Sequence, residues 1–68
     1  MSVGNAMLAV GDKVRITNGN LFLGKWIPAG TEGGVTGRVY DELGRPTLYL
    51  INIQGKTYTI APAEVEKI

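Results

Sequence analysis

Two short segments, one near each end of the chain, constrain its fold most strongly. The first, Gly11-Asp12-Lys13-Val14-Arg15-Ile16, reads as a turn that starts a strand, because polar and apolar residues alternate over residues 13–17. The second is Pro62-Ala63-Glu64-Val65-Glu66-Lys67-Ile68. Residues 61–65 contain a proline and are too few for a stable helix, which predicts a single 3₁₀ turn followed by a short closing strand over residues 66–68.

Between these segments the chain alternates strand patterns with turns that contain glycine. Three further strands are expected over residues 33–40, 47–53 and 57–60. Residues 21–27 are expected to form an apolar, aromatic loop, and no segment has the periodicity of a helix. The sequence therefore predicts an all-β domain, a small five-stranded SH3-like barrel with one 3₁₀ turn before the last strand.

The domain organisation follows from the same pattern. The barrel should occupy residues 11–68, preceded by a flexible N-terminal lead-in over residues 1–10. Met7, inside that lead-in, is a second candidate for the natural start of the chain.

Side-chain alternation along the strands predicts the core. The strand over residues 47–53 is apolar on both faces, and only one face can point into so small a barrel. We assign Leu48 and Leu50 to the interior, which leaves the other face of this strand outside. The predicted core consists of Val14, Ile16, Val35, Val39, Leu48, Leu50, Ile60 and Val65.

Composition argues against catalysis. The 68 residues include no histidine and no cysteine, which removes the usual general base, the commonest zinc ligands and any disulfide. The acidic residues are scattered among turns without a close carboxylate pair. We therefore expect a protein that is not an enzyme and that carries no cofactor and no metal.

The expected location is the cytoplasm. No signal peptide is evident, and no apolar run approaches the ~20 residues that cross a bilayer. We expect no association with membranes.

Surplus apolar surface predicts a protein partner. Trp26, in a loop with Phe22, either anchors a partner or plugs one open end of the barrel. The outer face of the 47–53 strand adds Tyr49, Ile51 and Ile53, which is more apolar surface than a soluble monomer usually exposes. We expect these five residues at or near a contact in a homo-oligomer or an obligate heteromer. Alternatively, the long loop folds over that strand and buries its outer face internally.

A nucleic-acid-binding barrel of the KOW type is the main alternative function. Basic and aromatic side chains on adjacent strands could grip phosphates and stack bases. The candidates are Lys13, Arg15, Arg38, Tyr40, Lys56 and Tyr58. The same side chains also fit ordinary cross-strand pairs, and a net charge of +1 lacks the basic excess of a dedicated DNA binder.

The strand and turn motifs resemble those of a known group of small barrels. Gly11-Asp12-Lys13-Val14-Arg15-Ile16, Gly30-Thr31-Glu32-Gly33-Gly34-Val35 and Ala63-Glu64-Val65-Glu66-Lys67-Ile68 are similar to segments of the SH3-like barrels that accompany photosynthetic electron-transfer complexes. Examples are the variable chain of ferredoxin-thioredoxin reductase and the small stromal subunits of photosystem I. This resemblance implies a non-catalytic accessory or docking role.

A second resemblance is to the small all-β dihydrofolate reductase carried on resistance plasmids. It rests on Asn5-Ala6, Gly11-Asp12-Lys13-Val14-Arg15 and Glu66-Lys67-Ile68. That family forms a tetramer of barrels around one pore, where a lysine follows the arginine of the first strand and a Val-Gln-Ile-Tyr strand precedes the closing turn. This chain has Ile16 and Tyr58-Thr59-Ile60-Ala61 at those places, so the resemblance extends to the barrel and not to reductase activity.

Overall fold

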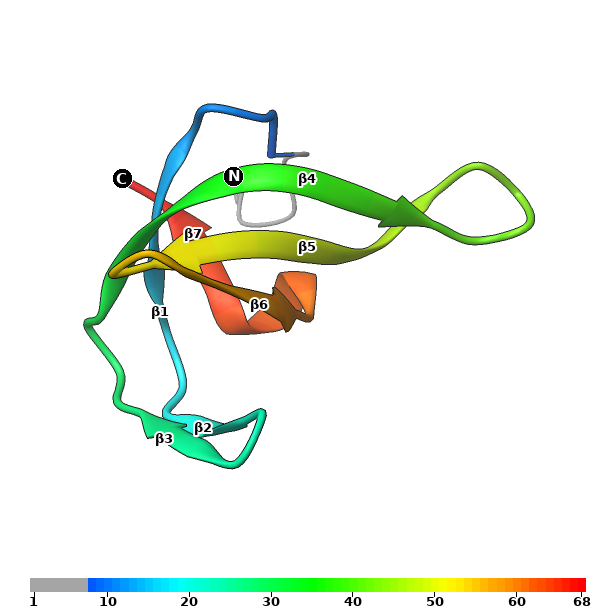
Figure 1. Ribbon diagram of the computed structural model, residues 1–68. Helices are drawn as coiled ribbons and strands as arrows, with labels where there is room; N and C mark the ends of the chain where they lie inside the picture. Colours follow the sequence, from blue (N-terminus) through cyan, green and yellow to red (C-terminus); the bar gives the residue numbers. More distant parts are fainter. Residues whose placement is uncertain (1–7) are drawn as a thin grey trace, which may run out of the picture.

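The computed structural model describes residues 8–68, which form seven strands and one 3₁₀ turn (Figure 1). In chain order these are β1 (Lys13–Ile16), β2 (Asn20–Phe22), β3 (Lys25–Ile27), β4 (Glu32–Tyr40), β5 (Pro46–Ile53), β6 (Lys56–Ile60), η1 (Pro62–Glu64) and β7 (Val65–Lys67). The all-β prediction is confirmed, as is the 3₁₀ turn before the last strand.

Five of the strands form one antiparallel sheet in the order β6-β5-β4-β1-β7. β6 and β7 are its two outer strands and are not hydrogen-bonded to each other, so backbone pairing does not close this sheet into a barrel. β2 and β3 form a separate hairpin, which stands apart from the ribbon of the sheet in Figure 1. The inward side chains of this hairpin reach the common core.

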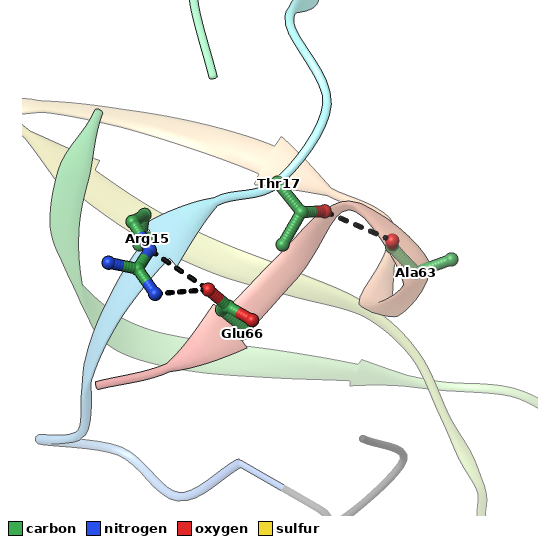
Figure 2. Close-up of polar contacts among 4 residues, drawn as sticks. All are labelled: Arg15, Thr17, Ala63 and Glu66. Atoms are coloured by element: carbon green, nitrogen blue, oxygen red, sulfur yellow. Dashed lines mark hydrogen bonds and ion pairs between the residues drawn. The ribbon is translucent and has the colours of Figure 1, made fainter. Parts of the chain in front are cut away.

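The two end segments that constrain the sequence lie side by side in the fold. β1 pairs with β7, and Arg15 donates a hydrogen bond from Nε to Glu66 Oε2 at 2.9 Å (Figure 2). Thr17 extends the contact to η1, because its N–H donates to Glu64 O at 2.8 Å and its hydroxyl to Ala63 O at 3.4 Å. The start and the end of the chain are thus joined at one edge of the sheet.

The hairpin β2–β3 replaces the loop predicted over residues 21–27, and that prediction is wrong. Its two-residue turn is Leu23-Gly24, with φ of +53° and +77°. Positive φ at both central residues defines the type I′ turn that suits the twist of paired strands. The usual sequence signal for this turn is Asn-Gly or Asp-Gly. Because this turn is Leu-Gly, its sequence does not indicate a hairpin.

The core lies between the sheet and this hairpin. Of the predicted core residues, Val14, Ile16, Val35, Ile60 and Val65 are confirmed. Within residues 8–68 the buried apolar residues are Leu8, Val14, Ile16, Phe22, Ile27, Val35, Tyr49, Ile51, Ile53, Tyr58, Ile60 and Val65.

The facing predicted for β5 is wrong. Tyr49, Ile51 and Ile53 point into the core, whereas Leu48 and Leu50 lie half-buried on the outer face. Gly33 explains why the isoleucines fit inside. A Cβ atom on this glycine would lie 2.5 Å from the backbone oxygen of Asn52 and 2.9 Å from both Ile51 Cγ2 and Ile53 Cγ1, so the absence of a side chain at position 33 lets β5 and its two isoleucines approach this closely.

The inward facing predicted for Val39 is also wrong, and a β-bulge is the reason. Pairing with β5 passes from Val35↔Ile51 to Gly37↔Leu50, which leaves an extra residue on β4. Beyond the bulge the two faces of β4 exchange, so Val35 is buried while Val39 is exposed.

Leu8 packs into the core ahead of the predicted barrel. Its side chain is buried, its N–H donates to the Tyr49 hydroxyl at 3.1 Å, and its carbonyl accepts a hydrogen bond from Arg38 Nη1 at 3.3 Å. Part of the segment predicted to be a flexible lead-in is therefore held in place. The rest of that prediction, including Met7 as a start, lies outside the described residues.

Candidate interaction surface

The β2–β3 hairpin has one buried face and one exposed apolar face. Phe22 and Ile27 point into the core. Leu21 and Trp26 pair across the two strands on the opposite face and are 62% and 59% exposed. Because side chains alternate along a strand, burying Phe22 and Ile27 turns this pair outward.

Leu23, at the tip of the hairpin, extends the apolar surface. It is 71% exposed and sits in the left-handed region of the turn. A branched side chain in this region costs about 1–2 kcal/mol relative to a right-handed conformation. We call Leu21, Leu23 and Trp26 together the hairpin face.

Gly19 positions the tryptophan ring. A Cβ atom on this glycine would lie 2.8 Å from Trp26 Cζ2, so the ring edge rests on bare backbone. Trp26 is thus held from one side while most of its surface remains open. Phe22 and Ile27, and not Trp26, fill the interior beneath the hairpin.

The base of the hairpin is tied to η1. Asn20 donates from Nδ2 to Glu64 Oε2 at 3.0 Å, and its own Oδ1 accepts the N–H of Leu21 at 2.8 Å. The hydrogen bond from Asn20 to Glu64 connects the hairpin to η1, which directly precedes β7, the strand that pairs with β1. The hairpin face is consequently presented from a fixed base.

No protein-family model, curated protein or solved structure matches this chain.

Among the five residues predicted at a partner contact, only Trp26 lies on the surface. Phe22, Tyr49, Ile51 and Ile53 are buried in the chain's own core. The predicted outward facing of the three β5 side chains is wrong, because this face of β5 points into the core. Leu21, which pairs with Trp26, and Leu23 at the hairpin tip belong to residues 21–27, where every residue except Gly24 and Lys25 is apolar, so no alternation is visible in the sequence.

The structure does not bring the predicted nucleic-acid residues into one open surface. Lys13 pairs with Glu32 at 3.4 Å, and Arg15 pairs with Glu66. Tyr58 is only 1% exposed, with Lys56 Nζ 5.6 Å from its ring centroid, so this ring cannot stack on a base.

The remaining two members of that set lie together on the β4–β5 hairpin. Arg38 Cζ lies 5.5 Å from the ring centroid of Tyr40, which is 48% exposed, while Arg38 also binds the carbonyl of Leu8. The six residues therefore form local pairs and not a continuous basic stripe.

The ion pairs among residues 8–68 lie across turns and strand pairs. Asp41 accepts the backbone N–H groups of Arg45 at 3.0 Å and Leu43 at 2.8 Å, and Arg45 Nε donates to it at 3.1 Å. The backbone hydrogen bond from Arg45 is the main cause that lowers the pKa of Asp41 below its ordinary value. Across residues 8–68 no three His, Cys, Asp or Glu side chains are placed to hold a metal ion, and no helix is long and apolar enough to cross a membrane.

Proposed function

We propose that this protein is a non-catalytic, cytoplasmic protein-interaction module that binds a partner protein through the hairpin face. The observation that carries the proposal is the exposure of three large apolar side chains on one hairpin whose opposite side is buried. Contiguous exposed apolar surface favours a contact with another molecule, since covering it removes the surface from water.

Two features of the hairpin favour an evolved contact over incidental exposure. Gly19 holds the Trp26 ring in place, so less side-chain freedom is lost when a partner covers it. Leu23 occupies a left-handed position that asparagine or glycine would fill with less strain. Gln54 has the same φ in the β5–β6 turn, so the distinctive feature of Leu23 is its exposed apolar side chain.

The chemistry of the hairpin face indicates the kind of partner. Leu21, Leu23 and Trp26 are all apolar, whereas the one charged residue of the hairpin, Lys25, pairs with Phe22 and belongs to the opposite face. A partner with an apolar recess would cover this face. The resemblance of the strand motifs to accessory barrels of larger complexes agrees with such a role.

Site-specific photocrosslinking in the cell of origin tests the proposal. A benzophenone side chain at Leu23 should give a discrete crosslinked species that disappears when Trp26→Ala is added. The matched control is the same probe at Leu43, which is 75% exposed but lies in the β4–β5 turn. Equal crosslinking from both positions, or none from Leu23, would contradict the proposal.

A further inference from the structure

The outer edge of β6 offers two backbone positions for pairing. The turn before this strand is Gln54-Gly55, with φ of +53° and +86°, and Ile53 pairs with Lys56 across it. In such a two-residue hairpin the closing pair exchanges hydrogen bonds, and the pattern alternates along the strands. The backbone groups of Tyr58 and Ile60 therefore point toward β5, and those of Thr57 and Thr59 point toward the open edge.

Nothing in the described chain, residues 8–68, pairs with this edge. β2 lies near β6 but is not hydrogen-bonded to it, and Thr57 and Thr59 are exposed. Their backbone groups have no partner among residues 8–68.

After Lys56, the exposed charge at its first position, β6 lacks the usual protection against pairing. Natural edge strands carry charges, prolines or bulges, or are very short. Residues 57–60 contain none of the first three, whereas β7, the opposite edge strand, has three residues and exposes Glu66 and Lys67.

We propose that β6 pairs with β6 of a second copy of this chain, in antiparallel orientation about a twofold axis beside Tyr58. In this register Thr57 lies opposite Thr59 of the second copy, so all four outward-facing positions pair. Threonine is favourable in such cross-strand pairs. Lys56 lies opposite Ile60 of the second copy, so no like charges face each other along the strand.

The twofold register is the reason for choosing a second copy over an unrelated strand. Side-chain type and charge along β6 are compatible with their own reverse order, which is what an isologous contact requires. The inference does not rest on the hairpin face, which lies on different strands.

Sedimentation of the full 68-residue chain over a wide concentration range gives the first test. The expected result is a reversible shift from 7.3 kDa to twice that mass. Thr59→Pro should raise the dissociation constant of the dimer at least about tenfold, because it removes an outward N–H that the β5–β6 ladder does not use. Thr59→Val keeps this N–H and the branched shape, and should dimerise like the parent chain.

A charge exchange keeps the test decisive if the proline variant does not fold. T57K/T59K and T57E/T59E should each be monomeric, because the register places like charges opposite each other, and their mixture should form a heterodimer. A parent chain that stays monomeric would overturn the proposal. So would a dimer that survives a folded Thr59→Pro, or one that Trp26→Ala dissociates, since the latter places self-association on the hairpin face.

Discussion

At the scale of single residues, Gly19 and Trp26 form a matched pair. The backbone of Gly19 is outside the left-handed region, so alanine is compatible with its conformation, and the new methyl group would meet the Trp26 ring at 2.8 Å and Ala29 N at 3.3 Å. The side chain that is absent at position 19 therefore determines where the exposed ring lies.

We expect Gly19→Ala to displace the ring and change the emission of the single tryptophan, with a change in unfolding free energy of no more than about 1 kcal/mol. Fluorescence spectra and urea unfolding measure the two effects. Gly34→Ala is the control, because its new methyl would approach nothing closer than Asp12 O at 3.9 Å. An emission spectrum unchanged by Gly19→Ala would show that the ring does not rest on this glycine.

At the scale of elements, the two tight turns have the same geometry and different side chains. Leu23 in the β2–β3 turn and Gln54 in the β5–β6 turn both have φ of +53° and both precede glycine. Asparagine adopts this conformation more readily than either residue. Comparing the same substitution at Leu23 and at Gln54 therefore separates the effect of backbone strain on stability from the effect of the apolar side chain on partner binding.

Leu23→Asn and Gln54→Asn should each raise the melting temperature, by relief of about 1 kcal/mol of backbone strain. Only Leu23→Asn should weaken the photocrosslinking of a partner, read from a probe at Leu21, because only it removes part of the hairpin face. Thermal unfolding and crosslinking yield measure these effects. If both variants reduced crosslinking equally, the apolar tip would not be the contact.

How far the sequence predicts these elements depends on local signals. Alternation at Val14 and Ile16 identifies β1 correctly, and the proline of η1 identifies the 3₁₀ turn before β7. The β2–β3 hairpin escapes prediction because its turn residues lack the usual signal and its strands are apolar on both faces. The bulge between Val35 and Gly37 is set by pairing with another strand, which counting along one strand cannot reveal.

The candidate site is predictable only in part for the same reason. Trp26 is conspicuous as the single tryptophan, and its exposure follows once Phe22 faces inward. The buried face of β5 packs Ile51 and Ile53 against Gly33, a residue on a neighbouring strand. Tertiary contacts of this kind decide facing when both faces of a strand are apolar.

At the scale of the whole molecule, stability depends on the inner face of β5. Ile51 is completely buried, and Ile51→Ala should lower the unfolding free energy by about 2–5 kcal/mol, a large share of the stability of a small domain. Leu50→Ala should cost less than Ile51→Ala, because Leu50 is half-buried on the outer face over Gly37. Urea denaturation of the two variants measures this order, and the reverse order would contradict the facing of β5.

The packing and hydrogen bonding of Leu8 determine where this chain can be truncated or fused to another protein. Tyr49 and Arg38 hydrogen-bond to the N–H and the carbonyl of Leu8, as a neighbouring strand would. The Leu8 side chain fills part of the interior. A fragment that begins at β1 would leave a cavity where the Leu8 side chain packs. It would also remove one hydrogen-bond partner each from the Tyr49 hydroxyl and the Arg38 guanidinium. The smallest autonomous fragment therefore begins no later than Leu8, and a fusion junction placed after it would cut into the folded body.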